Sequence, residues 1–131
     1  MASNHPRPLS PHLTIWRWGP HMAVSILHRI TGVGLTIVGL AALAWWLAAI
    51  AEGAEALERF TGLAGSPLGL VILVGLTWAF FQHLLSGLRH LVMDSGAGFE
   101  LQTNKTMAIL TVVGALFLTA ISWALFLGVL A

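Results

Sequence analysis

Three long apolar stretches constrain the fold of this chain more than any other feature. They cover about residues 21–51, 67–93 and 106–131, and polar segments separate them. Each stretch is long enough for an α-helix to cross the roughly 30 Å hydrocarbon core of a bilayer at about 1.5 Å per residue. Hydrophobic residues make up 57% of the chain and charged residues only 8%, which a water-soluble domain would not tolerate. The sequence therefore predicts an all-α membrane protein with three transmembrane helices in contact with the lipid bilayer.

A polar segment, residues 1–20, precedes the first apolar stretch. Prolines at positions 6, 8, 11 and 20 interrupt any helix there, because proline lacks the backbone N–H and clashes with the preceding turn. We therefore expect an extended N-terminal arm, followed by a transmembrane domain over residues 21–131. The arm has neither the apolar core of a secretory signal nor the Arg-rich, Ser-rich character of a transit peptide. These features favour a bacterial inner membrane over a mitochondrial one.

The few charged residues predict the orientation of the chain in the membrane. Arg59 lies in the first loop. The other basic residues fall on the same side of the membrane as the N-terminus: Arg7, Arg17, Arg29, Arg89 and Lys105. Basic residues collect on the cytoplasmic side, so we expect a cytoplasmic N-terminus and a periplasmic C-terminus. Glu52, Glu55 and Glu58, spaced three apart in the first loop, indicate a solvated surface helix. A net charge of +1 without a recurring basic patch argues against nucleic-acid binding.

Ionisable side chains gather near the end of the second apolar stretch. His83, Gly87, His90 and Asp94 follow the spacing i, i+4, i+7, i+11, which places them along one face of a helix. Ionisable residues in a membrane helix are costly and usually face the interior of the bundle. Gly87 would leave room for a flat ligand bound at His83. Alternatively, the histidines hydrogen-bond to neighbouring helices and Gly87 only permits close packing.

A second polar cluster opens the first apolar stretch. Ser25, His28, Arg29 and Gly32 follow the spacing i, i+3, i+4, i+7 and share one helix face. Arg29 alone would be explained by a side chain that extends to the membrane surface. Together with Ser25 and His28 it predicts a polar site instead. Because consecutive spans are antiparallel, both clusters are expected at the same depth near the cytoplasmic side.

The residue types limit the chemistry of such a site. The chain has no cysteine, so it supplies no iron–sulfur ligand, no thiolate nucleophile and no covalent haem attachment. No Walker loop, nucleotide fingerprint, serine triad or zinc-protease motif is present. Histidine can ligate haem iron, and arginine can pair with the haem propionates. Hydroxyl and guanidinium groups can also donate to quinone carbonyls. These residues alone do not distinguish a haem or quinone site from a small transporter.

Three segments carry a resemblance to a known family. RPLSPHLTIW (residues 7–16), SILHRITGVGL (25–35) and HLLSGLRHLVMD (83–94) resemble signature segments of the cytochrome b subunit of succinate dehydrogenase. This subunit is the larger membrane anchor of succinate:quinone oxidoreductase. The match covers the arm and the first two spans in order, and the third span matches only as an apolar helix.

The resemblance implies specific roles for the polar residues. His83 would be an axial ligand of haem b, and His28 and Arg29 would lie near the haem propionates. Ser25 and Arg29 would form part of the ubiquinone site, and His90 would contact the cofactor. Catalysis of succinate oxidation would belong to other subunits, since this chain has no flavin or iron–sulfur site. Propionate contact, proton relay and docking stay open as roles for Arg89, His90 and Asp94.

The resemblance also implies partners. In that family, electrons pass from a flavoprotein subunit through an iron–sulfur subunit to ubiquinone in the membrane, and the arm would lie against the iron–sulfur subunit. His90 is on the same helix face as His83, about 10.5 Å away by helical rise, so both cannot ligate one iron from opposite sides. A second small membrane-anchor subunit is therefore expected to supply the other haem ligand. The alternative is a haem-free structural anchor, as in some related fumarate reductases.

Overall fold

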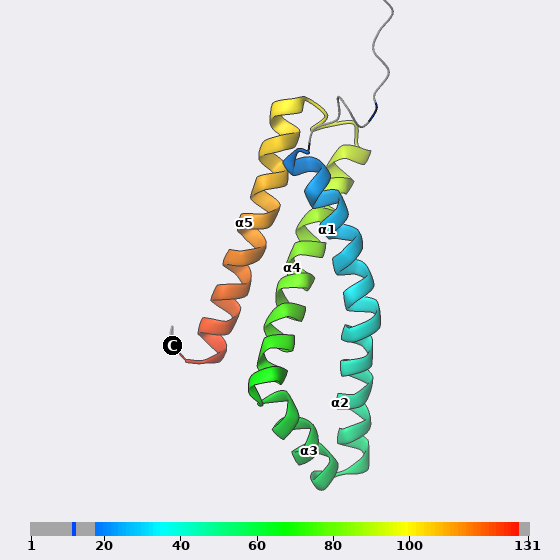
Figure 1. The fold of residues 1–131 in the computed structure, drawn as a ribbon, viewed down its shortest axis with the longest axis vertical. Coiled ribbons are helices and arrows are strands. Elements are labelled where there is room, and N and C mark those ends of the chain that lie inside the picture. Colours follow the sequence, from blue (N-terminus) through cyan, green and yellow to red (C-terminus); the bar gives the residue numbers. More distant parts are fainter. Residues whose placement is uncertain (1–11, 13–17, 129–131) are drawn as a thin grey trace, which may run out of the picture.

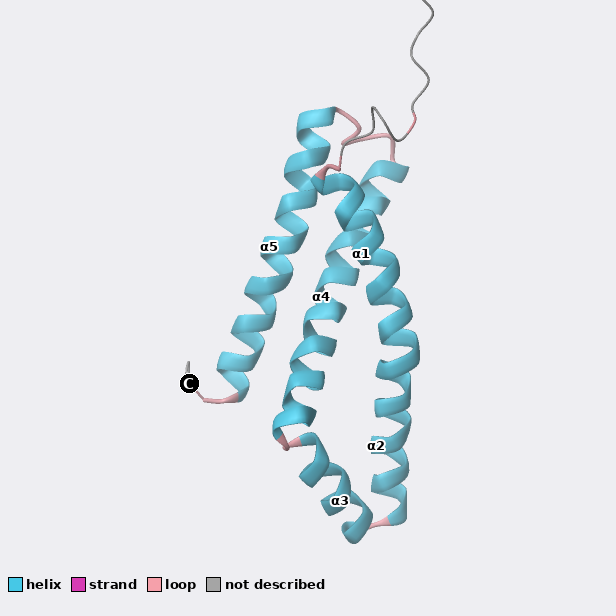
Figure 2. Ribbon diagram, in the orientation of Figure 1, coloured by secondary structure: helices cyan, strands magenta, loops and turns pink. Residues whose placement is uncertain are grey.

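The chain is described by a computed structural model that places His12 and residues 18–128. Most of the expected N-terminal arm, including Trp16, lies outside the described residues. The described part contains helices and no strand, in the order α1 (Pro20–Gly34), η1 (Leu35–Gly39), α2 (Leu40–Glu52), α3 (Ala54–Ala64), α4 (Pro67–Asp94) and α5 (Leu101–Phe126). Figure 2 shows this succession of helices and short connections. The predicted all-α architecture is confirmed.

Three continuous helical segments are long and apolar enough to cross a membrane. They are Pro20–Glu52, Pro67–Asp94 and Leu101–Phe126, and they agree in number with the predicted spans. In Figure 1 the first segment runs from one end of the molecule to the other, α4 returns, and α5 runs back down beside it. The helix α4 contacts both α1 and α5. The beginning of α1, the end of α4 and the beginning of α5 therefore share one end of the molecule (Figure 1).

Local sequence explains where these helices begin and end. Pro20 and Pro67 occupy first-turn positions, where their missing N–H costs nothing and their fixed φ suits a helix. Ser66 caps α4 by accepting a hydrogen bond from the backbone N–H of Gly69 at 3.1 Å. The first segment ends at Gly53, whose φ of 107° is a conformation that glycine adopts without strain. The helix α5 begins at Leu101, so its first turn consists mostly of polar residues that precede the apolar run.

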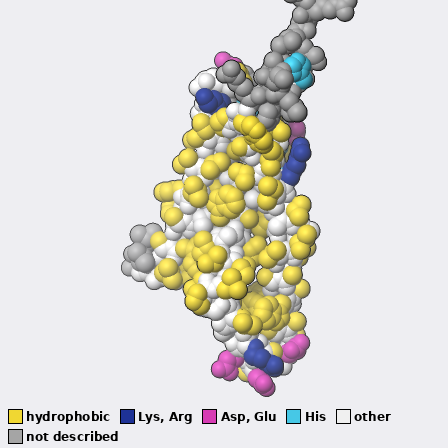
Figure 3. All heavy atoms as spheres, in the orientation of Figure 1, with side chains coloured by type: hydrophobic (Ala, Val, Ile, Leu, Met, Phe, Trp, Pro, Cys, Tyr) yellow, Lys and Arg dark blue, Asp and Glu magenta, His cyan; other side chains and the backbone are white. Residues whose placement is uncertain are grey.

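The surface of the molecule agrees with a lipid environment. Figure 3 shows apolar side chains over the middle of the visible face and charged side chains toward the two ends. Large apolar residues such as Ile37 and Phe117 are more than 60% exposed. The fully buried apolar positions hold mostly small side chains, such as Ala108 and Ala115 on α5. Small residues let membrane helices approach closely, and this close packing holds the helices together where bilayer lipids provide no hydrophobic force between them.

Two local features of the first segment and its loop have structural consequences. The segment η1 is a π-helical turn inside the first span, and Thr36 within it donates its hydroxyl to the carbonyl of Gly32 at 2.8 Å. The short helix α3 carries Glu55 and Glu58 on its exposed surface, and Glu55 forms an exposed ion pair with Arg59 at 3.5 Å. A surface helix is therefore present in the first loop, but Glu52 lies at the end of α2 and does not share that helix with Glu55 and Glu58 as predicted.

Candidate cofactor site between α1 and α4

Three histidine side chains meet where α1 and α4 pack together. His28 on α1 stacks on His83 of α4, with ring centroids 4.0 Å apart and an interplanar angle of 6°. His90, two turns further along α4, lies 5.1 Å from His28 by ring centroids, with the rings tilted by 59°. The two polar clusters predicted from the sequence are thus side by side, as antiparallel packing of α1 and α4 requires.

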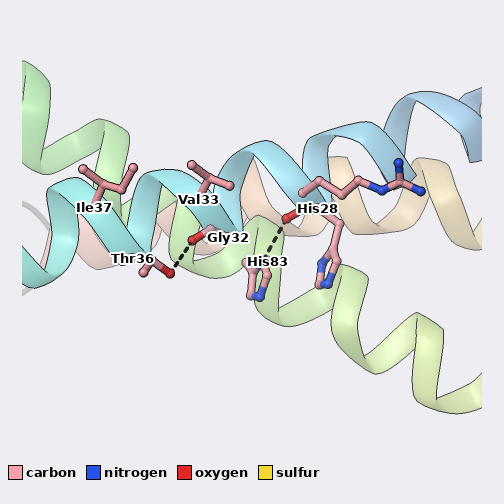
Figure 4. A pocket seen from close by; sticks show the side chains of 7 residues that line it. His28, Gly32, Val33, Thr36, Ile37 and His83 are labelled. Carbon is pink, nitrogen blue, oxygen red and sulfur yellow. Dashed lines mark hydrogen bonds between the residues drawn. The ribbon is translucent and has the colours of Figure 1, made fainter.

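Backbone and hydroxyl groups of α1 determine which ring nitrogen of His83 carries the proton. Its Nδ1 lies 3.0 Å from the carbonyl oxygen of His28 (Figure 4). The same atom lies 3.4 Å from Oγ1 of Thr31. A carbonyl oxygen can only accept, so the Nδ1 of His83 must carry the proton and donate it. The neutral ring then has its lone pair on Nε2, which makes no hydrogen bond within the described residues. This tautomer is the one that binds a metal through Nε2.

Gly32 lets the His83 ring approach α1 this closely. A Cβ atom at position 32 would lie only 2.9 Å from Cε1 of His83 and 3.4 Å from its Nδ1. Real Cβ atoms essentially never lie that close to another heavy atom. The neighbouring glycine on α1, Gly34, has open space at the same position. Close packing against His83 is therefore specific to Gly32.

A hollow of about 530 Å³ lies beside the two stacked histidines. His28 and His83 form one part of its wall, and the remaining lining comes from the first span: Arg29, Gly32, Val33, Thr36 and Ile37. Figure 4 shows the two imidazoles side by side below α1, with the labelled apolar side chains of Val33 and Ile37 farther along the helix. The hollow combines a largely apolar wall with two imidazoles and one cation.

These residues fit a haem group on three counts. His83 offers a lone pair on Nε2, as described above. The Nδ1 atom of His28 is buried and has no hydrogen-bond partner within the described part of the chain, so a bound group could satisfy it. Arg29 is exposed at the edge of the hollow and is not engaged in an ion pair with any described residue, which leaves its guanidinium able to pair with a carboxylate.

The other predicted site residues lie around this hollow rather than in it. Ser25 is half-buried on α1, one turn before Arg29, and its side chain makes no hydrogen bond within the described residues. His90 is half-buried and contacts His28, whereas Asp94 is exposed at the end of α4. Gly87, expected to leave room beside His83, faces His28 instead: a Cβ there would lie 3.7 Å from Cε1 of His28.

Arg89 does not belong to the histidine face. Only 5% of its surface is exposed, and its Nη2 donates to Oδ1 of Asn104 on α5 at 2.7 Å. Gln82 and Ser86 are also fully buried on α4, and Gln82 donates to the Ser86 hydroxyl at 2.9 Å. These three α4 residues follow the spacing i, i+4, i+7, which the sequence shows but which the prediction overlooked. They form a second, structural polar stripe.

Comparison with known proteins assigns the class of this molecule. Its three long apolar helices are those of a multi-pass membrane protein. The family described as succinate dehydrogenase/fumarate reductase transmembrane subunit matches residues 3–122. The chain belongs to this family, in which its similarity is to the cytochrome b subunits of succinate dehydrogenase. The resemblance seen in the sequence is thereby confirmed.

Individual relatives match over most of their length. The succinate dehydrogenase cytochrome b556 subunit of Paracoccus denitrificans is 37% identical over 120 residues, which cover 92% of each chain. The subunit of the same name from Rickettsia conorii is 37% identical over 117 residues, covering 89% of this chain and 90% of the relative. The mitochondrial cytochrome b560 subunit of Sus scrofa is 37% identical over 122 residues, covering 87% of this chain and 70% of the relative.

Proposed function

We propose that this chain is the cytochrome b membrane-anchor subunit of succinate dehydrogenase, that it binds haem b, and that it forms part of the ubiquinone-reduction site. The observation that carries this proposal is the hydrogen bond from Nδ1 of His83 to the carbonyl of His28 at 3.0 Å. It leaves Nε2 as the free, metal-binding nitrogen beside a hollow that also contains Arg29. The cytochrome b names of the relatives support the same cofactor.

Each polar residue of the site then has a defined role. His83 would bind the haem iron through Nε2, and haem would supply one-electron transfer when bound. Arg29 and His28 would hold the propionates, because one carries a positive charge and the other an unpartnered buried nitrogen. Ser25 and Arg29 would donate hydrogen bonds to a carbonyl of ubiquinone. His90 would contact the cofactor from its position beside His28.

A second membrane-anchor subunit would complete the haem site. His28 would not serve as a second iron ligand in the observed arrangement, since its ring stacks on that of His83 with centroids 4.0 Å apart. His90 lies two turns along the same helix as His83. A histidine from a partner's spanning helix would therefore supply the second protein ligand of the iron. An iron–sulfur subunit and a flavoprotein subunit would deliver the electrons from succinate, with the N-terminal arm against the iron–sulfur subunit.

The charge distribution supports an orientation in the bacterial inner membrane. Arg29, Arg89 and Lys105 belong to the end where α1 begins, and Arg59 belongs to the opposite end, on α3. By the positive-inside rule, the end with the histidines faces the cytoplasm. The C-terminus after α5 then faces the periplasm. This orientation would bring the site next to soluble subunits that oxidise succinate in the cytoplasm.

Haem ligation is tested by comparing His83→Ala with His90→Ala in the purified membrane complex. His83→Ala should abolish the b-type absorption band of the reduced complex, whereas His90→Ala should retain it, because the His28 carbonyl holds Nδ1–H of His83 at 3.0 Å and leaves the His83 Nε2 for the iron. A wild-type complex without any such band would contradict the proposal and favour the haem-free structural anchor.

The quinone role is tested separately with Ser25→Ala. Loss of one donor to a carbonyl of the bound quinone should cost about 1–3 kcal/mol of binding and should raise the KM for ubiquinone. Succinate oxidation by an artificial acceptor should be unchanged, because that reaction bypasses the membrane. Arg29→Leu should have a larger effect of the same kind. Unchanged quinone reduction in both variants would place the quinone site elsewhere.

A further inference from the structure

We infer that α1, rather than α4, sets the orientation and the ligand strength of His83. The inference rests on the proposed haem ligation and assigns positioning roles to Gly32 and Thr31. The α1 clamp is defined here as three groups around the His83 ring: the carbonyl of His28, the hydroxyl of Thr31 and the bare Cα of Gly32. Neither Gly32 nor Thr31 would touch the iron, and both would act through His83.

The first part of the α1 clamp is steric. With a Cβ at position 32 only 2.9 Å from Cε1 of His83, any side chain there must push the ring away from α1. That displacement would lengthen the 3.0 Å contact between Nδ1 and the His28 carbonyl. The obstructing atom belongs to the imidazole ring itself, which is short and has few alternative rotamers. The absence of a side chain at Gly32 is thus what permits the observed ring position.

The second part of the α1 clamp is the hydrogen bonding of Thr31. This residue is only 2% exposed, and its hydroxyl donates to the carbonyl of Leu27 at 2.7 Å. Because its single proton points to its own helix, the hydroxyl oxygen presents a lone pair to Nδ1 of His83 at 3.4 Å. The Nδ1–H group is therefore shared between two acceptors. Acceptors at this nitrogen make the opposite nitrogen a stronger metal ligand.

The consequence concerns the cofactor rather than the fold alone. A more electron-rich imidazole stabilises ferric iron relative to ferrous iron, and so lowers the reduction potential. Removing an acceptor from Nδ1 should raise that potential. A tenfold change in the ratio of ferric to ferrous binding corresponds to about 59 mV for one electron. The α1 clamp would therefore tune haem from a helix that does not contribute the iron ligand.

Gly32→Ala and Gly34→Ala in the assembled complex form a matched pair. Both add one methyl group to α1, but only position 32 faces His83, and position 34 has open space. Gly32→Ala should lower haem affinity by about 10- to 100-fold, the usual effect of disturbing the partner of a metal-bound histidine. It should also change the electron paramagnetic resonance spectrum of the remaining ferric haem. Gly34→Ala should leave the haem content and the spectrum unchanged. Equal behaviour of the two variants would overturn the inference.

Thr31→Val and Thr31→Ser keep the test decisive if Gly32→Ala does not assemble. Valine matches the shape of threonine without its hydroxyl, and serine restores the hydroxyl. Thr31→Val should raise the haem midpoint potential by up to about 59 mV, equivalent to a tenfold change, and Thr31→Ser should return it to the wild-type value. An unchanged potential in Thr31→Val, with haem lost in His83→Ala, would refute the α1 clamp alone. Retention of haem in His83→Ala would refute the proposed ligation itself.

Discussion

The buried hydrogen bond between Arg89 and Asn104 offers a direct test of what holds α5 against α4. We predict that Asn104→Ala lowers the free energy of unfolding by about 1.5–3 kcal/mol. The bond is short, at 2.7 Å between Nη2 and Oδ1, and Arg89 is 95% buried. Hydrogen bonds to charged groups contribute about 1.5–3 kcal/mol. Neutral hydrogen bonds within membrane proteins average only about 0.6 kcal/mol.

Because Arg89 is charged, we expect the larger of these two energies, the one for hydrogen bonds to charged groups. Its Nε is already buried without a partner within the described residues, so losing Asn104 would remove a further contact of an incompletely satisfied guanidinium. Asn104 also donates from Nδ2 to the carbonyl of Gly98 at 3.2 Å, which ties the α4–α5 loop to α5. The alanine variant would lose both contacts, and with them the contact of Nδ2 with Sδ of Met93 at 3.3 Å. The upper part of the range is therefore expected.

The assay is unfolding of the purified complex in mixed micelles by increasing amounts of sodium dodecyl sulfate, followed by tryptophan fluorescence. Thr103→Ala is the matched control. Thr103 adjoins Asn104 in the sequence, and its hydroxyl makes only an exposed hydrogen bond to Glu100, at 3.1 Å. That control should change the free energy by no more than about 0.5 kcal/mol. If Asn104→Ala and Thr103→Ala unfold at the same detergent fraction, the Arg89 hydrogen bond does not stabilise the helix pair.

Further predictions concern the other helix ends and the topology. Ser66→Ala removes the cap of α4 and should cost about 1 kcal/mol, measured as a lower midpoint in the same detergent titration. Gly69→Ala should prevent assembly, because its Cβ would collide with backbone carbonyls at the end of α3, whereas Gly75→Ala, which meets open space, should assemble normally. Reporter fusions should read periplasmic near Glu55 and cytoplasmic near Gly98, and the opposite pattern would refute the proposed orientation.

The sequence predicts the three spans well because length and apolar composition alone determine them. Helical spacing also grouped His83 with His90 on one face of α4, and Ser25 with His28 and Arg29 on α1. It could not predict the stacking of His28 on His83, since that contact depends on how closely α1 and α4 approach. That approach depends in turn on Gly32. The spacing of residues places Gly32 on the polar face of α1 but does not show that His83 packs against it.

Arg89 shows where reasoning from adjacency fails. It adjoins His90 in the sequence, but one residue turns a helix by about 100°, and this turn directs Arg89 toward α5 instead of toward the histidines. Its partner Asn104 lies in the polar first turn of α5. No periodic pattern of apolar residues in that turn indicates that Asn104 faces α4. The buried group formed by Gln82, Ser86 and Arg89 has a clear helical spacing that identifies it in retrospect.

The π-helical turn at Leu35–Gly39 holds one residue more than regular winding of the first span would need. A π turn closes i→i+5 hydrogen bonds where an α-helix closes i→i+4, so it takes up the extra residue within one turn and leaves the helix faces on either side in nearly the same register. Deleting one residue there would therefore restore regular winding while Trp45 keeps its ring contact with Phe60 on α3, at 5.0 Å, and His28 keeps its stacking on His83. The same deletion in a regular stretch of the span would rotate everything after it by about 100°. The first span can therefore lose a residue at this turn without altering the geometry of the histidines.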